Sequence, residues 1–592
     1  MIQDLLITHI ASAFKSIYQA DIDSKLIVLE STKPDFVGDY TFVVFAYLKT
    51  SKKNPEQTAN DIGNYLLENL NEISSFNVIK GFLNLVVSDA YWLNFLKQNY
   101  NNTQYALGAK TNQKILVEYS SPNTNKPLHL GHVRNNLLGF SVAEILKANG
   151  HEVYTCNLVN DRGIHICKSM LAWMQQGKGE TPESSGMKGD HLVGKYYVAF
   201  DKQYKEEIKA LIAEGKSEEF AEKNAASILA AQTLLQKWEA GDEETVRIWR
   251  MMNGWVYAGF DVTYKKMGVS FDKYYYESNT YLLGKEIVQE GLDKEVFYKK
   301  DDGSVWIDLT ADGLDHKLLL RGDGTSVYIT QDIGTAELKY NDFACERSIY
   351  VVGNEQDYHF KVLQLICKKL NKSYADGIFH LSYGMVELPH GKMKSREGTV
   401  VDADDLIDGM LQTAEDTTKA LGKTEGLAEK DLEILYKTIG MGALKYFLLK
   451  VDPKKKMMFN PEESIDFQGN TGPFIQYTHA RIKSILRNAT SIDYTSVDTT
   501  KVTLQKAEKE LIFLAFQYAD VIKEAGNDLS PGVLCNYVYE VAKSFSSFYH
   551  ECPILKEANE EQKKLRLQIC NMTAYIVKSG FALLGIQVPE RM

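Results

Sequence analysis

The first 110 residues mix helical and strand-like spacing of apolar positions, which is typical of a small α+β domain. Val, Ile, Phe and Tyr dominate the runs that we expect to form strands, and Pro55 suits the first turn of a helix. The pattern predicts helices at 2–19 and 55–70, and strands at 25–31, 41–48 and 81–88. A polar stretch at 99–104 is the predicted linker to the next region.

From residue 114 onwards, the order of predicted elements becomes strand, helix, strand. Apolar runs at 114–120 and 151–159 flank a helical stretch at 131–149, and Gly150 suits the position just past a helix end. This order is typical of the βαβ unit of a parallel, doubly wound sheet. Two further strand-like runs return later, at 347–359 and 377–386.

The last region shows helical spacing only, and the core of a helical bundle explains such apolar stripes. The chain is therefore predicted to be a multidomain α/β protein. Its Rossmann-like domain is expected to carry a charged helical insertion at about 170–250 and a second insertion at about 275–325. The predicted domains are an α+β domain at 1–110, a doubly wound parallel-sheet domain at 111–410 and an all-α domain at 411–592.

The composition is that of a globular protein of 592 residues, with 44% hydrophobic and 24% charged residues. No apolar run approaches the ~18 residues of a membrane span, and Asp4 and His9 argue against an N-terminal signal peptide. Seven cysteines without a CxxC pair favour a reducing cytoplasm and argue against a zinc site. The net charge of -11 weighs weakly against a nucleic-acid partner, but it leaves room for a local basic face.

The sharpest chemical signal is His129-Leu130-Gly131-His132, where the first predicted strand turns into the helix. A helix N-terminus offers unpaired N–H groups and the positive end of its dipole, and both favour phosphate. The two imidazoles can donate hydrogen bonds to phosphoryl oxygens, and Gly131 leaves room for a base or a ribose. The alternatives are a metal-ligand pair and ordinary histidines at a helix start, although no HExxH motif or cysteine cluster supplies further zinc ligands.

A second candidate phosphate site is the glycine-flanked basic loop at 391–398, which reads GKMKSREG. Cations clustered between glycines can close over a triphosphate and release it afterwards. When this loop is considered alone, a solvated basic turn is the simpler explanation. No Walker A sequence occurs, so a protein that uses ATP here must bind it in another way.

Together, and about 260 residues apart, the two motifs resemble the HIGH and KMSKS signatures of class I aminoacyl-tRNA synthetases. Further blocks across nearly the whole chain narrow the resemblance to the bacterial-type arginyl-tRNA synthetases. These blocks are 118–129, 323–332, 472–481 and 589–592, and GFLNL at 81–85 is similar to the N-terminal domain of that family. The chain departs from the family pattern in its KMKSR loop and at Asn160-Asp161-Arg162-Gly163, where the family more often has Gly-Asp-Trp-Gly.

The resemblance implies an arginine–tRNA ligase that activates L-arginine with ATP and transfers it to the 3′-terminal adenosine of tRNA(Arg), releasing AMP and pyrophosphate. Carboxylates suit an arginine substrate, because they accept hydrogen bonds from a guanidinium in bidentate fashion. The resemblance implies that the guanidinium lies between Glu118, Tyr328 and Asp332, and that Asn123 and Gln356 hold the other end of the amino acid. Without it, a capped strand-end Glu and a surface Asp are the simpler explanation, and the spacing alone does not distinguish arginine from lysine.

The other implied site residues bind ATP or tRNA. The resemblance implies that ATP is bound by Lys126, His129, Gly131, His132, Lys392 and Met393. It implies that the catalytic residues are Lys126, His129, His132, Lys392 and Arg396. The all-α region would bind the anticodon, the N-terminal domain would also contact tRNA, and the tRNA-binding residues would be Gln476, Tyr477, Arg481 and Met592. Mg²⁺ is expected with ATP, without a resident metal or a tightly bound prosthetic group, in a cytoplasmic monomer that binds no membrane.

Three alternatives to this function remain open from the sequence. A nucleotidyltransferase of the HxGH type could make a small adenylated product without RNA, but about 200 C-terminal residues would then have no role. A non-catalytic RNA-binding scaffold would not need His129, His132, Glu118 and Asp332. A class I synthetase for another amino acid is disfavoured by the two carboxylates at positions 118 and 332.

Overall fold

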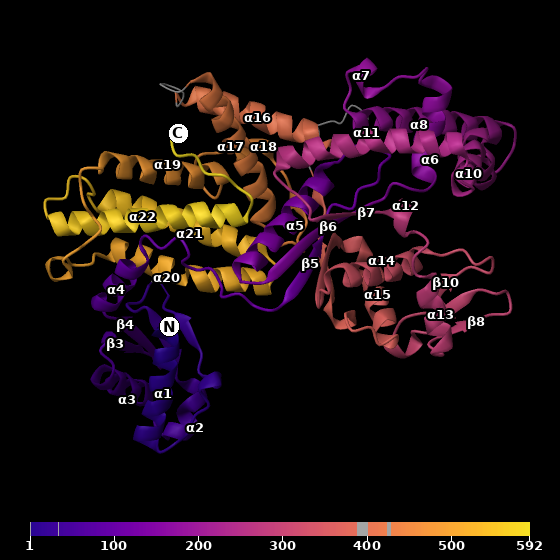
Figure 1. Cartoon of the computed structure of the whole chain (residues 1–592). Coiled ribbons are helices and arrows are strands. Elements are labelled where there is room, and N and C mark those ends of the chain that lie inside the picture. Colours follow the sequence, from indigo (N-terminus) through magenta and orange to yellow (C-terminus); the bar gives the residue numbers. More distant parts are fainter. Residues whose placement is uncertain (1, 34, 388–400, 423–427) are drawn as a thin grey trace. The chain divides into compact units, whose positions relative to one another are not determined.

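The computed structural model describes residues 2–33, 35–387, 401–422 and 428–592 (Figure 1). The chain forms two compact units, and each is assembled from three separate segments. The first unit comprises Met1–Tyr105, Ile482–Tyr518 and Lys543–Ile576, and the second comprises Ala106–Arg481, Ala519–Ala542 and Val577–Met592. No helix among the described residues is both long and apolar enough to span a membrane.

The N-terminal part of the first unit is an antiparallel four-stranded sheet with helices, as predicted for an α+β domain. The strand order is β1 (Leu29–Ser31), β2 (Tyr40–Val43), β4 (Phe82–Val87) and β3 (Ile73–Ile79). The helices are α1 (Ile2–Tyr18), α2 (Leu48–Ser51), α3 (Pro55–Asn69) and α4 (Asp89–Asn99). The predicted helices at 2–19 and 55–70 are confirmed, and Asn54 caps α3 by accepting a hydrogen bond from the Gln57 N–H at 2.8 Å.

Two predicted strands of this region are shorter than the sequence indicates. Residues Ser24–Leu26 form a 3₁₀ turn before β1, and Phe45–Tyr47 form another between β2 and α2. A short apolar run has the same appearance in a strand and in a buried turn, so periodicity alone cannot separate them. The strand β3 was not predicted, because Ser74, Ser75 and Asn77 interrupt its apolar pattern.

The helices of the C-terminal region confirm the all-helical prediction for that part of the chain. They are α19 (Gly472–Asn488), α20 (Lys506–Asn527), α21 (Pro531–Glu551) and α22 (Glu560–Leu583). Within the first unit, the fully buried ring of Trp92 on α4 contacts Phe513 and Phe516 on α20, with ring centroids 5.6 and 5.5 Å apart.

The second unit is built on the predicted parallel sheet, which has five strands. Their order is β12 (Ile378–Tyr383), β11 (Arg347–Gly353), β5 (Lys114–Glu118), β6 (Glu152–Val159) and β7 (Lys273–Tyr276). The helix α5 (Leu130–Ala148) connects β5 to β6 and packs Leu138, Val142 and Leu146 into a core with Ile115 and Val117. The carboxyl ends of all five strands therefore lie at one edge of the sheet.

Two insertions interrupt this sheet, as predicted. The first contains the helices α6 (Ile164–Gln176), α7 (Pro182–Ser185), α8 (Gly189–Ala213), α9 (Glu218–Asn224), α10 (Ala226–Glu239) and α11 (Glu243–Met267) (Figure 1). The second contains α12 (Glu277–Thr280), α13 (Lys285–Asp293) and an antiparallel sheet of β8 (Phe297–Lys299), β9 (Val305–Ile307) and β10 (Lys317–Leu320).

The remaining elements of this unit follow the second insertion. They are α14 (Tyr328–Phe343), α15 (Asp357–Lys369), β13 (Val386–Glu387), α16 (Ala403–Ala420), α17 (Glu429–Leu449), β14 (Met457–Met458) and α18 (Pro461–Ser464).

Candidate active site

A strained turn follows β5 at the carboxyl edge of the parallel sheet. Ser120 and Ser121 have φ angles of +79° and +45°, a region that L-residues rarely adopt. Two buried asparagines hold this turn: Asn135 accepts from the Ser120 N–H at 2.6 Å, and Asn157 accepts from the Ser121 N–H at 3.0 Å. Asn135 also donates to the Val351 carbonyl at 2.7 Å, so three neighbouring elements fix the chain as it enters the site.

The two histidines of the HxGH motif cap the N-terminus of α5. The His129 N–H donates to Nδ1 of His132 at 3.3 Å, and the Gly131 N–H donates to Nδ1 of His129 at 3.1 Å. Because a backbone N–H can only donate, each Nδ1 must be an acceptor, and the proton of each neutral ring therefore sits on Nε2. Both rings thus present an Nε2–H donor at a helix N-terminus, which suits hydrogen bonds to phosphate.

Both imidazoles are uncharged at neutral pH. Burial and the nearby charge of Lys126 lower the pKa of His129 to about 4. Burial and the charges of His129 and Lys126 lower the pKa of His132 well below its usual value. The rings lie with centroids 3.9 Å apart, so the pair remains neutral and can donate without mutual charge repulsion.

Gly131 makes room for the first of these rings. A Cβ atom at this position would lie 2.9 Å from Cε1 of His129, which is closer than real Cβ contacts. Gly131 therefore leaves room for the His129 imidazole, and its predicted role in making room for a base or a ribose stays a prediction.

A cavity of about 850 Å³ opens beside the loops that follow β5 and β6. Glu277, at the start of α12, contributes a half-buried carboxylate to its wall. The predicted residues Asn123 and Tyr328 also line the cavity. Its other charged or polar lining residues include Asn160, Arg162, His165, Glu239, Lys285, Arg321 and Gln331.

Glu277 is the carboxylate of this cavity that lacks a cationic partner. Burial raises the pKa of Glu277 to about 7, the charge of Arg162 opposes this shift, and the charges of Asp161 and Asp332 add to it. The Arg162 guanidinium pairs with Glu239 and stacks over the Tyr281 ring at 3.9 Å. No side chain of the described residues forms an ion pair or hydrogen bond with Glu277. The cavity can therefore accept a cationic group from a ligand.

Glu277 was not predicted from the sequence, although a signal for it was present. Glu277 directly follows the aromatic strand β7, as Glu118 completes β5, and both strands end at the same edge of the sheet. An acidic residue at the carboxyl end of a buried parallel strand is a candidate ligand-binding group in such sheets.

The predicted arginine-binding residues do not all reach the cavity. Asp332 lies one turn beyond Tyr328 on α14, which confirms that this segment is helical, and its Oδ2 lies 2.6 Å from Nε2 of His359. Gln356 is exposed and is not among the lining residues.

Glu118 differs most from its prediction. Its side chain is buried and forms an ion pair with Lys339, and Sγ of Cys156 donates to it at 3.8 Å. Burial alone would lower the pKa of Lys339, but the Glu118 charge raises it, so the pair is ionised inside the core. Lys339 thus removes the free-energy cost of burying the Glu118 carboxylate without a partner. Glu118 does not line the cavity.

Gln476, predicted to bind tRNA, also has an internal role. It is fully buried and donates to the carbonyls of Thr438 at 2.9 Å and Gln587 at 2.8 Å. Its amide therefore cannot reach an RNA, because it holds the C-terminal segment against α17. Tyr477 and Arg481 lie one turn apart on the more accessible side of α19, where the guanidinium donates to the phenol oxygen at 3.0 Å.

Four further positions were predicted to bind ATP or tRNA or to act in catalysis. Lys392, Met393 and Arg396 lie outside the described residues, and Met592 is half-buried at the chain end. The turn at 160–163 persists: Asp161 is buried and accepts from the Tyr257 hydroxyl at 2.6 Å and the Ser278 N–H at 2.8 Å, and Gly163 has a φ of +101°.

Three regions of the chain match known protein families. Residues 95–460 match the family described as tRNA synthetases class I (R), catalytic domain, residues 475–592 match the DALR anticodon binding domain, and residues 4–87 match the arginyl tRNA synthetase N terminal domain. The chain is 56% identical over 595 residues to the arginine–tRNA ligase of Bacteroides fragilis, with 100% of both chains covered. It is also 56% identical over 604 residues to that of Flavobacterium psychrophilum, again with 100% of both covered.

Solved structures support the fold. The arginyl-tRNA synthetase of Thermus thermophilus aligns with a TM-score of 0.81 at 23% identity, covering 100% of both chains. That of Plasmodium falciparum aligns with a TM-score of 0.78 at 19% identity, covering 100% of this chain and 99% of the other.

Proposed function

Since the chain belongs to the class I arginyl-tRNA synthetases, we propose that its cavity binds the side chain of L-arginine and that His129 and His132 bind ATP. The protein is an arginine–tRNA ligase, with arginine, ATP and tRNA as its substrates. The observation that carries the proposed arginine site is the carboxylate of Glu277, which faces the cavity without a cationic partner.

In the proposed complex, the guanidinium of arginine lies against Glu277. A planar guanidinium and a carboxylate form two parallel charge-assisted hydrogen bonds, and these are strong in a partly buried site. Tyr328 and Asn123 line the same cavity, and Asp332 lies one turn from Tyr328, within reach of Glu277 electrostatically. In this proposal Glu277 takes the role that the family resemblance implied for Glu118, and Asp332 adds a second negative charge nearby.

We propose that the histidines act on the phosphates of ATP. The carboxylate of arginine attacks the α-phosphate in line, which yields arginyl-adenylate and pyrophosphate. The neutral Nε2–H groups of His129 and His132 donate to the phosphoryl oxygens as negative charge develops, and Lys126 adds a positive charge nearby. The terminal ribose hydroxyl of the tRNA then attacks the activated carbonyl, and AMP leaves. Lys392 and Arg396 are proposed to neutralise the departing pyrophosphate, with Met393 beside the nucleotide.

We propose that Mg²⁺ arrives with ATP, held mainly by phosphate oxygens and water. Among the described residues, Asp190, His191 and Asp404 have ligand atoms within 4.8 Å of one another, a spacing that suits a metal ion. However, the ammonium of Lys188 already pairs with both carboxylates of this group. The protein side chains therefore favour a cation that the substrate carries over a resident one.

The remaining assignments concern tRNA and the assembly. We propose that Tyr477, Arg481 and Met592 contact tRNA, since tyrosine can stack on an unpaired base and arginine can bind phosphate. The domain roles proposed are tRNA binding for 1–110, catalysis for 111–410 and anticodon binding for 411–592. All seven cysteines are buried free thiols, which agrees with a reducing cytoplasm. A monomer remains the proposal, because one chain supplies both substrate sites.

The test of this function is aminoacylation of total bacterial tRNA with each labelled amino acid in turn. We expect acid-precipitable label from arginine alone, and we expect Glu277→Gln to lower kcat/KM for arginine about 100-fold, because charged hydrogen bonds contribute about 3 kcal/mol. The control is Glu286→Gln, which removes the same charge from an exposed position on α13. Labelling from a different amino acid, or unchanged arginine kinetics in Glu277→Gln, would contradict the proposed pocket.

A further inference from the structure

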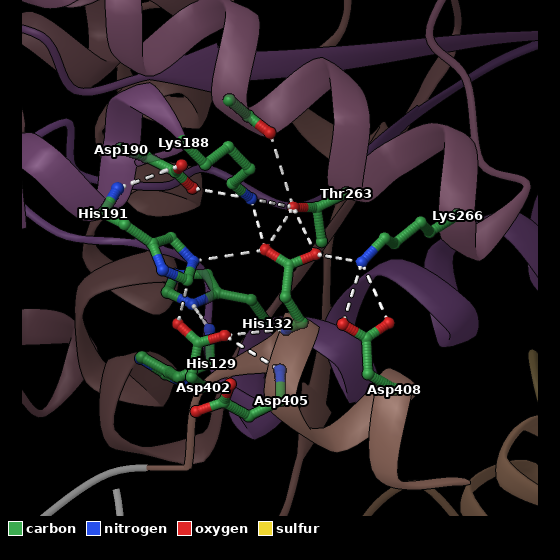
Figure 2. A network of polar contacts seen from close by, with 12 residues as sticks. His129, His132, Lys188, Asp190, His191, Thr263, Lys266, Asp402, Asp405 and Asp408 are labelled. Carbon is green, nitrogen blue, oxygen red and sulfur yellow. Dashed lines mark hydrogen bonds and ion pairs between the residues drawn. The ribbon is translucent and has the colours of Figure 1, made fainter. Parts of the chain in front are cut away.

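A network of charged side chains lies beside the HxGH motif and outside the cavity (Figure 2). It joins three helices of the second unit that are far apart in the sequence. Lys188, Asp190 and His191 stand at the start of α8, and Thr263 and Lys266 belong to α11. The remaining members, at the start of α16, are Asp402, Asp404, Asp405 and Asp408.

Asp404 is the centre of the network. The Lys188 ammonium pairs with Asp404, lies 3.1 Å from Asp190 Oδ2 and donates to the Thr263 hydroxyl at 2.6 Å. His191 Nε2 lies 3.3 Å from Asp404 Oδ2, and Lys266 Nζ lies 3.3 Å from its other oxygen. The Asp404 side chain is only 10% exposed, so these contacts are largely shielded from water and are stronger than surface ion pairs.

The approach of α8 to α11 is built into the sequence by a glycine. A Cβ atom at position 259 of α11 would lie 2.3 Å from Oδ1 of Asp190. Any larger residue there would displace Asp190, which pairs with Lys188. The two insertion helices therefore present Lys188 to α16 in a fixed position.

The segment just before Asp404 is hydrogen-bonded to the segment that carries His129. The segment 401–403 pairs in antiparallel fashion with 128–130: the Leu130 N–H donates to the Val401 carbonyl at 2.9 Å, and the Ala403 N–H donates to the Leu128 carbonyl at 2.9 Å. Between these two hydrogen bonds, Asp402 lies opposite His129. His129 therefore keeps its position only while the segment before α16 keeps its own.

We propose that Lys188, acting through Asp404, is a positioning residue for His129 and His132 in the step that uses ATP. The insertion helices hold the start of α16 by this ion pair, and the start of α16 holds the backbone at His129 by two hydrogen bonds. Lys188 contacts neither histidine and does not line the cavity, so it acts through the chain rather than on the substrate. The inference rests on the proposed role of the histidines in ATP binding.

The same geometry favours a positioning role over a metal site. A metal ion between Asp190, His191 and Asp404 would have to displace the Lys188 ammonium and the charge of Lys266. With both lysines in place, the carboxylate of Asp404 is already shared by two cations and one imidazole.

The test compares Lys188→Met, Lys188→Arg and Asp404→Asn with a control, Lys195→Met. Lys195 lies on the same helix and pairs with Glu180 at 2.7 Å, but it is more exposed and does not contact α16. Aminoacylation is measured with ATP varied and then with arginine varied. We expect Lys188→Met and Asp404→Asn to lower kcat/KM for ATP about 30-fold and to change KM for arginine less than twofold. Lys188→Arg should recover most of the loss, and Lys195→Met should match the unmodified protein.

A second measurement distinguishes a failure of this inference from a failure of the proposed function. It is the binding of a non-hydrolysable ATP analogue, measured by titration calorimetry on the same full-length proteins. Weakened binding in Lys188→Met, with Lys195→Met unaffected, supports the positioning role even if arginine is not the amino acid charged. If Lys188→Met does not fold, the near-isosteric Asp404→Asn gives the answer. If Lys188→Met impairs the use of ATP and of arginine to the same extent, or leaves kcat/KM for ATP unchanged, the inference is overturned.

Discussion

Two glutamates at the same edge of the parallel sheet have opposite environments. Glu118 ends β5 and is paired inside the core with Lys339, whereas Glu277 follows β7 and faces the cavity without an ion-pair partner. Both are shielded from water, but only Glu118 forms an ion pair, whereas the charge of Arg162 opposes the pKa shift of Glu277 without direct contact. A buried acidic residue at a strand end therefore identifies a binding site only when the fold leaves it unpaired.

The largest effect should come from breaking the internal pair. Lys339→Met leaves the Glu118 carboxylate buried and unpaired, so we expect a loss of stability of about 3–5 kcal/mol. Urea unfolding followed by circular dichroism measures this loss. The double variant Glu118→Gln with Lys339→Met should lose less than the sum of the two single changes. If Glu118→Gln instead leaves stability unchanged and abolishes arginine use, the roles assigned to the two glutamates are reversed.

The next effect is a pH dependence that belongs to Glu277 alone. The folded pKa of Glu277 is raised to about 7, so its carboxyl is protonated below that pH and cannot pair with a guanidinium. We expect kcat/KM for arginine to rise about tenfold per pH unit up to pH 7 and to level off above it. The profile of Glu277→Gln should lack this limb. A wild-type profile that is flat between pH 5.5 and 8 would argue against Glu277 as the guanidinium partner.

The smallest effect tests the neighbour that tunes this pKa. The charge of Arg162 opposes the rise in the pKa of Glu277, so Arg162→Gln should raise that pKa further. The midpoint of the arginine pH profile should then move by less than one unit to higher pH, as read from initial rates. Arg247→Gln, which removes an exposed arginine paired with Glu244 on α11, should leave the midpoint in place. A shift to lower pH in Arg162→Gln would show that another group controls the profile.

Much of the fold followed from local patterns in the sequence. The order of apolar runs around α5 predicted the parallel sheet, because a doubly wound unit repeats a simple strand, helix, strand pattern. The same reasoning failed at Phe45–Tyr47, where an apolar run forms a 3₁₀ turn instead of extending a strand. Such short runs are resolved only by the tertiary packing around them.

The site could be predicted where the residue spacing of a motif determines its local structure. His129, Gly131 and His132 lie within one helical turn, so their spacing predicts a helix N-terminus with two imidazoles. Glu118 and Gln476 could not be assigned in this way, because their partners lie 221 and 111 residues away in the sequence. Whether a buried polar group is satisfied is a property of the fold, and no local pattern records it.

The division of the chain into interleaved segments has a consequence for its synthesis on the ribosome. Each compact unit needs a segment from the last fifty residues of the chain: 543–576 completes one and 577–592 completes the other. Neither unit can therefore complete its native packing before these two segments have been synthesised, although the earlier segments of each unit are already present.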